Sequence, residues 1–460
     1  MYSKTKRQVF ASGKLSGSFQ SHVGLMQGDS LSPLLFSLFV NDLEAYLSEH
    51  GFNPINLNFA DINLFIKLFI ILYADDLAMV SESSENLQIG LNHLNNYART
   101  WKLQVNIKKT KVSVFGVGNP DVSFEFDGKV IDIVDSFTYL GVNFTSDGSF
   151  KSQVSRVRDQ GRKAMFLLLS KGRQLQLSLG TYLQLFEKMV LPVLTYGCEV
   201  WGFEKLDVLD KLQLEFIRYV LKLNKCTPIA MLYAESGILP ISTVVKGRML
   251  KFYQKLGNPV VDTLSSLVFM FVQRMDRQVV FKSKWFKCIR DIFIDLGDIV
   301  TYNNQTILQD TYVRWARLQL RDVFIGRCMA RISSLPKCEL YIMFKHTFGA
   351  EHYLMALPPD LAVSLCKFRT SNHKLEIERL RYGPNRRHRN ERYCSKCTGN
   401  ELGNEYHHVI YCEAFRGLRE KYIPRYYCTK PNLVKFLDLI KKEGMAFRLA
   451  KFLKESQKGY

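Results

Sequence analysis

Two apolar runs on either side of adjacent carboxylates constrain the fold more than any other part of this sequence. The first run, Leu68 to Ala74, leads into Asp75 and Asp76, and the second run continues through Val80. Short apolar runs that flank a bend predict two buried strands in a tight hairpin, with the acids at its tip. A rigid hairpin that presents carboxylates to a cleft suits a magnesium site. The same pattern also occurs as a plain solvated turn, so the surrounding segments must decide.

A glycine-containing segment precedes a predicted helix upstream of the hairpin. Ser32 suits the N-cap of that helix and Pro33 its first residue. This helical segment is expected to bury an apolar stripe formed by Leu34, Leu35, Leu38, Leu43, Tyr46 and Leu47. Gly28 would let a backbone approach a ligand closely, and the amide of Gln27 suits a base or sugar edge. Taken alone, the same dipeptide is typical of a turn.

Downstream of the hairpin the pattern changes from mixed to mainly helical. Apolar residues at helical spacing predict one buried helix face, formed by Leu87, Leu91, Leu94, Ala98 and Trp101. Beyond about residue 150 helical patterns prevail, as in the buried stripe expected at Leu209, Leu212, Phe216, Val220 and Leu223. Residues 21 to 145 therefore indicate an α+β region, and the rest a mainly helical one.

Four segments, in this order, resemble motifs of the reverse transcriptases of non-LTR (LINE-like) retrotransposons. They are Gln27 to Pro33 (motif B), Tyr73-Ala74-Asp75-Asp76 (motif C), Gln104 to Lys111 (motif D) and Phe137 to Val142 (the primer grip). The resemblance implies an α+β fold with an incomplete reverse-transcriptase palm. The expected regions are the palm at 1–145, a helical thumb-like region at 146–260, a helical connecting region at 261–380 and a basic zinc-binding module at 381–460.

The resemblance implies an RNA-directed DNA polymerase that transfers nucleotides with two magnesium ions. Its partners would be an RNA template, a DNA primer and dNTPs. Asp75 would be a metal ligand supported by Asp76, and Lys109 would protonate or stabilise the leaving pyrophosphate. For Lys109 a solvated basic face shared with Lys108 and Lys111 is the alternative. The nucleotide- and template-binding residues implied are Gln27, Gly28 and Tyr73, and those of the primer grip are Tyr139, Leu140 and Gly141.

The same family carries a further catalytic aspartate, in motif A, upstream of motif B. Only 23 residues precede Gly24, and residues 1–23 contain no Asp or Glu. Asp61 is the candidate to replace this aspartate, but it lies between motifs B and C, where a loop before the hairpin is expected, and we do not expect it to do so. We therefore expect an N-terminally truncated palm that is inactive alone. The alternatives are a nucleic-acid-binding remnant without chemistry and a host protein that uses the fragment for regulation.

The charge balance supports a polyanionic partner. Lys and Arg number 63 against 43 Asp and Glu in 460 residues, a net charge of +20, which usually indicates nucleic acid. The longest apolar stretch, Ile62 to Ala74, contains Lys67 and is shorter than the roughly 20 residues of a membrane span. The basic N-terminus is unlike a secretory signal, and the ten cysteines are mostly isolated. We expect an intracellular protein, in the nucleus or cytoplasm, without a membrane partner.

A cysteine and histidine cluster near the C-terminus has the spacing of a structural zinc site. The donors Cys394, Cys397, His407 and Cys412 follow the pattern C-x2-C-x9-H-x4-C. Adjacent His408 offers the same chemistry, and scattered buried cysteines beside solvated histidines remain an alternative. Similar clusters at the C-terminus of LINE-like proteins have an acid like Glu405 and an aromatic like Phe415, which favours His407. A basic run with Arg381, Arg386, Arg387, His388, Arg389 and Arg392 precedes the cluster and suits phosphate binding or a solvated loop.

Overall fold

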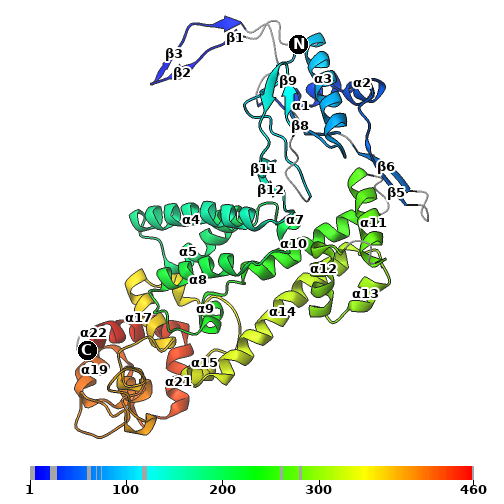
Figure 1. Cartoon of the computed structure of the whole chain (residues 1–460). Helices are drawn as coiled ribbons and strands as arrows, with labels where there is room; N and C mark the ends of the chain where they lie inside the picture. The colour runs from blue at the N-terminus through cyan, green and yellow to red at the C-terminus, as the bar shows by residue number, and fades with distance from the viewer. Residues whose placement is uncertain are drawn as a thin grey trace. The chain divides into compact units, whose positions relative to one another are not determined.

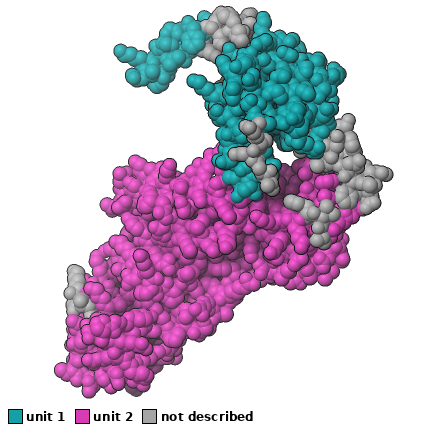
Figure 2. Space-filling model, in the orientation of Figure 1, with its two compact units in different colours: residues 1–137, 145–147 teal, residues 138–144, 148–460 magenta. Residues whose placement is uncertain are grey.

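The chain folds into two compact units. The computed structural model describes residues 6–20, 28–59, 64–68, 70–73, 75–116, 122–258, 263–278 and 282–457. Unit 1 comprises residues 1–137 and 145–147, and unit 2 comprises 138–144 and 148–460 (Figures 1 and 2). Unit 2 is a single compact unit that contains most of the three C-terminal regions expected from the sequence.

All described strands occur as two-stranded pairs in the first 145 residues. The pairs are β1 (Lys6–Arg7) with β4 (Phe19–Gln20), β2 (Phe10–Ala11) with β3 (Lys14–Leu15), β5 (Ile55–Phe59) with β6 (Leu64–Leu68), β7 (Ile70–Tyr73) with β8 (Asp76–Met79), β9 (Phe124–Phe126) with β10 (Lys129–Ile131), and β11 (Ser136–Tyr139) with β12 (Val142–Thr145). The expected hairpin around Asp75 is thus present as β7 and β8. The apolar stretch that precedes it forms two separate strands, β6 and β7, with different partners.

Two helices and the β9/β10 hairpin supply most of the core of unit 1. The described helices of this unit are α1 (Ser32–Phe39), which contributes no residue to that core, α2 (Leu43–Glu49) and α3 (Ser84–Thr100). Helix α3 starts where the Ser83 side chain accepts a hydrogen bond from the backbone N–H of Asn86, at 3.1 Å. The core consists of Leu43, Leu47, Phe52, Leu91, Leu94, Tyr97, Val112, Phe124, Phe126 and Ile131. The inner positions expected for α3 are confirmed, except that Trp101 lies just past the helix and is 43% exposed.

Helix α1 departs from the sequence prediction in two ways. Its cap position is Leu31 rather than Ser32, which is itself the first helical residue. The apolar stripe also breaks, because the chain leaves the helix at Val40 and starts α2 at Leu43. Leu34 and Leu38 are 57% and 64% exposed, whereas Leu43 and Leu47 are buried. A stripe continued across an unrecognised break changes direction at that break.

Helix α3 lies directly against the strand that carries Asp76. At Gly90 a side chain would be crowded, since a Cβ there would stand 2.6 Å from Cε of Met79 on β8 and 2.6 Å from a ring carbon of Phe52. Phe52 is fully buried. The glycine thus permits the close approach that seats the base of the β7/β8 hairpin on the core.

After the β11/β12 turn, unit 2 continues with helices, of which α5, η1, α6 and α8 pack on α4. In chain order they are α4 (Lys151–Gln174), α5 (Leu179–Leu185), the π-helical η1 (Phe186–Val190), α6 (Leu191–Leu194), α7 (Cys198–Trp201), α8 (Asp207–Leu221), α9 (Ile229–Ser236) and α10 (Ile241–Leu256). The stripe expected on α8 is confirmed, because Leu209, Leu212, Phe216, Val220 and Leu223 are all buried.

The remaining helices continue one core to the C-terminus. They are α11 (Leu264–Arg277), α12 (Lys284–Asp295), α13 (Ile299–Asn303), α14 (Asp310–Ser334), η2 (Pro336–Cys338), α15 (Glu339–Phe344), α16 (Tyr353–Ala356), α17 (Pro359–Arg369), α18 (Glu376–Arg379), η3 (Arg389–Glu391), η4 (His407–Tyr411), η5 (Glu413–Phe415), α19 (Arg416–Tyr422), α20 (Arg425–Cys428), α21 (Leu433–Lys441), η6 (Glu443–Met445) and α22 (Ala446–Ser456). The long helix α14 packs along α10 and extends toward the C-terminal helices (Figure 1).

Within the described residues, none of the individual helices has both the length and the apolar character to cross a membrane. Helices α9 and α10 are long and apolar enough only when they are taken together, and they are bent by 67° relative to each other.

A buried carboxylate joins four helices of unit 2. Glu235, at the end of α9, is fully buried and accepts hydrogen bonds from Nε of Arg369 at 2.7 Å, from Tyr353 at 2.6 Å and from Tyr341 at 2.8 Å. These partners come from α17, α16 and α15 respectively. A second acid, Glu351, pairs with Arg369 at 2.8 Å and with Lys345 at 2.5 Å.

Electrostatics explain why this carboxylate is tolerated. Burial is the largest single influence on the pKa of Glu235 and raises it. The charge and hydrogen bond of Arg369, together with Lys345 and Tyr353, outweigh burial and hold the pKa below its ordinary value of 4.5. The guanidinium of Arg369 also lies 4.5 Å from the ring centre of Phe344. The buried charges are thus paired and hydrogen-bonded, which is the condition for burying them.

Replacing Arg369 by methionine tests this network. Arg369→Met leaves Glu235 buried without its cation, so we expect the free energy of unfolding to fall by about 3–5 kcal/mol. The pH dependence should also reverse. In the parent, a lowered pKa gives stability that is present above pH 4.5 and lost as the pH falls. In the variant the unpaired carboxyl has a raised pKa, so stability is lost as the pH rises. Unfolding midpoints at several pH values measure both effects.

The matched control is Arg416→Met. Arg416 pairs with Glu420 on the surface, where both side chains are 70% exposed, and such pairs contribute less than about 1 kcal/mol. Equal losses in the two variants, or a parent-like pH profile for Arg369→Met, would contradict the role given to the buried pair.

A second test concerns the seat of the hairpin. Alanine is favoured over glycine in a helix by about 1 kcal/mol, but Gly90→Ala forces Met79 or Phe52 to move, at about 1–3 kcal/mol. We expect net destabilisation, with faster hydrogen exchange in α3 and β8. Gly326→Ala in α14 is the control, because nothing lies within 4 Å of a Cβ there. It should stabilise the protein, and the same sign for both variants would refute the crowding at Gly90.

Candidate functional site

The two carboxylates of the predicted metal site lie at the tip of the β7/β8 hairpin. Tyr73 pairs with Asp76 at the closing end of the ladder, and Asp75 lies in the turn. Both acidic side chains are exposed, whereas Leu77 and Met79 further along β8 pack against the core of unit 1. The hairpin therefore anchors its base on apolar residues and offers adjacent carboxylate oxygens at its tip. Such oxygens are ligands that Mg²⁺ prefers.

The upstream glycine has a conformation that explains its residue type. Gly28 has φ of +89° and is exposed, with no atom within 4 Å of a Cβ position. Positive φ, rather than close packing, requires glycine here. The turn into α1 is completed by the Asp29 side chain, which accepts from the N–H of Leu31 at 3.2 Å. Gln27 and Asp61 lie outside the described residues, as does the side chain of Tyr73.

Lys109 lies in a short turn after α3. Its backbone N–H donates to the Asn106 carbonyl at 3.0 Å, and the side chain is exposed. Its neighbour Lys111 pairs with Asp132. The turn therefore fixes the backbone of Lys109, and its catalytic role stays a prediction.

The segment predicted as a primer grip is the tight turn between β11 and β12. Leu140 and Gly141 both have positive φ, +46° and +79°, as a two-residue hairpin turn requires. Leucine is unusual there. The hydroxyl of Tyr196 donates to the Leu140 carbonyl at 3.0 Å, and its ring fills the space beside Gly141. Sequence reasoning did not single out Tyr196, because its partner is 56 residues away.

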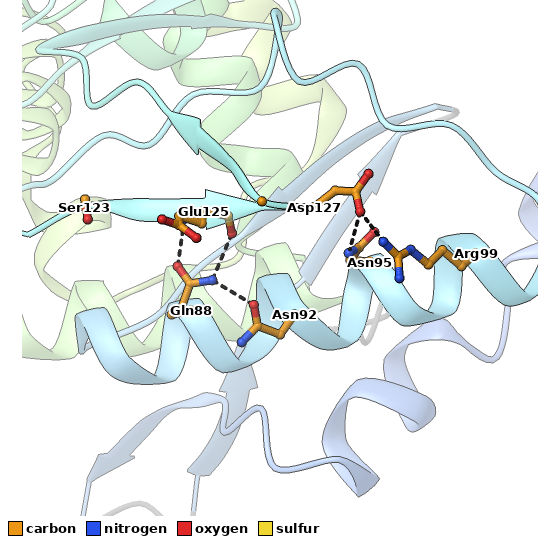
Figure 3. A pocket seen from close by; sticks show the side chains of 8 residues that line it. Gln88, Asn92, Asn95, Arg99, Ser123, Glu125 and Asp127 are labelled. Atoms are coloured by element: carbon orange, nitrogen blue, oxygen red, sulfur yellow. Dashed lines mark hydrogen bonds and ion pairs between the residues drawn. The ribbon is translucent and has the colours of Figure 1, made fainter.

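Unit 1 also has a polar groove between α3 and β9 (Figure 3). The Gln88 amide brackets the main chain of Glu125, donating to its carbonyl and accepting from its N–H, both at 2.9 Å. Further along the helix, Asn95 and Arg99 both reach the carboxylate of Asp127. Hydrogen bonds to Arg99 and Asn95 hold the pKa of Asp127 below its ordinary value. The groove side chains thus bind one another, and Gln88 covers the open edge of β9.

The four predicted zinc donors converge in the C-terminal part of unit 2. The donor atoms of Cys394, Cys397, His407 and Cys412 all lie within 4.8 Å of one another. Sγ of Cys394 is 3.8 Å from Sγ of Cys412, and Sγ of Cys397 is 3.4 Å from Nε2 of His407. A tetrahedron with metal–sulfur bonds of about 2.3 Å has edges of about 3.8 Å, and its sulfur–nitrogen edges are a little shorter. The alternative of scattered cysteines is therefore wrong.

The geometry also separates the two adjacent histidines. His407 turns toward the sulfurs, while Nε2 of His408 lies 3.0 Å from the Ser456 hydroxyl, and its ring packs against Phe415 and Phe452. The backbone explains this division. Residues 407–411 form a π-helical turn, in which the N–H of Cys412 donates to the carbonyl of His407 at 2.8 Å. A bond five residues long widens the turn and brings His407 and Cys412 to the same side.

A buried histidine–carboxylate contact joins this segment to the residues that follow α17. Nε2 of His373 lies 2.8 Å from Glu405, and both side chains are almost fully buried. Sequence reasoning noted Glu405 but missed His373, because the two are 32 residues apart with no periodic pattern between them.

Comparison with known proteins follows the same division of the chain. Residues 2–144 match the family described as "Reverse transcriptase (RNA-dependent DNA polymerase)". The chain is 24% identical over 216 residues to the probable RNA-directed DNA polymerase from transposon BS of Drosophila melanogaster, a match that covers 44% of this chain and 22% of that protein. It is 24% identical over 205 residues to the RNA-directed DNA polymerase from mobile element jockey of the same species, covering 42% and 20%.

A third relative is the Pol polyprotein from the type-1 retrotransposable element R2 of Popillia japonica, 26% identical over 237 residues, which cover 49% of this chain and 37% of that protein. The matches span about a fifth of the length of the first two relatives. Residues 2–144 thus match the reverse transcriptase family, and the chain is similar to the RNA-directed DNA polymerases of non-LTR retrotransposons.

Proposed function

We propose that this chain is part of an RNA-directed DNA polymerase in which Asp75 and Asp76 hold magnesium. The observation that carries the proposal is the β7/β8 hairpin, which presents two adjacent exposed carboxylates inside the family-matched region. Magnesium bound there would stabilise negative charge at a primer 3′-oxygen and at departing pyrophosphate.

The other residues would position the reactants. Lys109, exposed on a fixed turn, is proposed to neutralise or protonate the pyrophosphate. The β11/β12 turn would support the primer, with Tyr196 holding the Leu140 carbonyl in place. Contacts to the nucleotide and template are assigned to Gln27, Gly28 and Tyr73. The proposed partners are an RNA template, a DNA primer and dNTPs, and the proposed location is the nucleus, the cytoplasm or both.

The double variant Asp75→Ala, Asp76→Ala tests the metal site. We expect the parent to bind dNTP on an RNA–DNA primer–template only with Mg²⁺, because carboxylate and phosphate oxygens together complete the ion's coordination. The double variant should lose this magnesium dependence and keep its affinity for the primer–template. Fluorescence titration with a labelled dNTP measures both. Glu44→Ala, Glu49→Ala removes two exposed acids from α2 and should change nothing; equal behaviour of the two double variants would reject the assignment.

Primer extension in the same mixtures tests the expectation of inactivity. The carboxylates assigned to the metal site are Asp75 and Asp76 alone, whereas holding two magnesium ions calls for a further carboxylate, so we propose that the chain alone gives no product. Product that disappears in the Asp75, Asp76 variant would mean that another carboxylate of this chain completes the site.

Nucleic-acid binding without chemistry is the second candidate function. The excess of 20 positive charges favours it, since cations that neutralise phosphates release counterions and bind without reading sequence. The titration above separates the candidates, because this role predicts duplex affinity with no magnesium-dependent dNTP binding.

We infer that Cys394, Cys397, His407 and Cys412 hold a structural zinc ion. Three sulfurs and one imidazole nitrogen form the donor set that zinc prefers, and their spacing fits its bond lengths. Four protein ligands would close the coordination shell, which is the arrangement of structural rather than catalytic zinc.

The two histidines provide the test of the zinc site. We expect one zinc per chain. The His407→Gln variant should lose more zinc affinity than the roughly 10- to 100-fold that is lost when a hydrogen bond to a zinc ligand is removed. His408→Gln should keep the zinc and lower only stability, because His408 bonds to Ser456 instead. Zinc content by mass spectrometry and the unfolding midpoint with a chelator measure these effects. Zinc lost equally from both variants, or from neither, would contradict the ligand set.

A further inference from the structure

A cavity lined by four arginines and a histidine lies in unit 2, on the loop that precedes the cysteine cluster. It has a volume of about 390 Å³ and is lined by Arg386, Arg387, His388, Arg389 and Arg392. Small-ligand sites occupy about 300–1,000 Å³, so the cavity has room for more than a few waters. None of the described lining residues is acidic, and the lining is thus complementary to an anion.

The deepest of these residues is held in place by the loop itself. Arg392 is only 8% exposed. Its Nε donates to the Arg387 carbonyl at 3.2 Å and its Nη1 to the Ile377 carbonyl at 2.8 Å. A guanidinium has five N–H donors, so these neutral acceptors use only part of its capacity. The buried charge is therefore fixed in position and lacks a hydrogen-bonded carboxylate among the described residues.

The rest of the loop is equally well ordered by hydrogen bonds. The N–H of Arg387 donates to the Leu380 carbonyl at 3.0 Å. The single acid of the loop, Glu391, accepts from the backbone N–H of His388 at 3.3 Å as part of a capping box. The N–H of Gly403 donates to the Arg392 carbonyl at 2.8 Å. These bonds tie the loop to the segment between the cysteines, so the cavity wall is preformed.

Two of the arginines that line the cavity have no carboxylate partner among the described residues and can bind an anion. Arg389 pairs with Glu339, and both side chains are about half exposed. Arg386 and Arg387 form no ion pair with a described carboxylate, yet they line the same cavity as Arg392. Gathering cations around a buried guanidinium is unfavourable unless an anion joins them.

We propose that this cavity binds a phosphoryl group, presented by a nucleic-acid strand or as free phosphate, with Arg392 at the base and Arg386 and Arg387 closing over it. Arginine suits this ligand because its planar fork donates two parallel hydrogen bonds to phosphate oxygens. The assignment rests on the nucleic-acid partner of the proposed function and not on catalysis at Asp75. Three guanidiniums in one cavity favour a phosphoryl group over a monoanionic carboxylate.

The test is Arg386→Ala, Arg387→Ala, which leaves Arg392 and the fold's hydrogen bonds intact. Anisotropy with a single-stranded oligonucleotide should show affinity lowered by about tenfold or more at moderate salt. The slope of log affinity against log salt should fall in magnitude by about 0.7, because the variant neutralises one phosphate fewer of a single strand. Unchanged affinity and slope would overturn the proposal.

Arg425→Ala, Lys430→Ala is the control, because it removes the same charge from exposed positions of the same region. We expect a smaller change in affinity than for the cavity pair. An equal change would mean that net charge alone attracts the strand, and it would reject a defined site. The conservative Arg386→Lys, Arg387→Lys should restore charge but only part of the affinity; full restoration would reject recognition by the guanidinium fork.

Two further arms identify the source of the phosphoryl group. Competition by inorganic phosphate or pyrophosphate in the parent, absent in the cavity variant, supports a free or terminal phosphate. A requirement for a 5′-phosphate on the oligonucleotide supports a strand end, and displacement by strands alone supports an internal phosphate. The Asp75, Asp76 variant should retain this affinity, so failure at the cavity and failure at the hairpin are distinguishable.

Discussion

The buried ion pair between Glu235 and Arg369 is the constraint on which the packing of unit 2 depends. A charge at a fully buried position is tolerated only when its acceptors are occupied. Arg369, Tyr341 and Tyr353 come from three different helices and must all reach the carboxylate that ends α9. Hydrophobic burial has no preferred direction, so this network, rather than the apolar core around it, specifies how α15, α16 and α17 are placed.

Two contacts connect the Glu235–Arg369 network to the cysteine and histidine cluster near the C-terminus. Helix α22 packs against α17, which carries Arg369, and Ser456 near the end of α22 bonds to His408. The π-helical turn then directs His407 the other way, toward the three sulfurs. One histidine ties the turn to the core and its neighbour completes the donor set. The cysteine cluster is thus an extension of the helical core rather than an independent appendage.

The features that could be predicted from the sequence are those that depend on residues close together in the chain. The acids at the tip of β7/β8, the α8 stripe and the spacing of the four donors all follow from residues close in the chain. The stripe through Leu34 and Leu38 failed because no glycine or proline marks the break after Val40. Glu235, Tyr196 and His373 were missed because their partners are 32 to 134 residues away, and pairing at that distance leaves no periodic signal.

Two buried arginines in unit 2 show how stability and binding can be separated. Arg369 and Arg392 are 3% and 8% exposed, so both give up most of their hydration. Arg369 recovers it through two carboxylates, which accounts for its position by stability alone. Arg392 donates hydrogen bonds to two carbonyls only, and its neighbours in the cavity are three arginines and a histidine. Burial raises the cost of its charge and the surrounding arginines add to it, so the pKa of Arg392 lies below its ordinary value. A cation arranged against stability in a preformed wall is explained by what binds there.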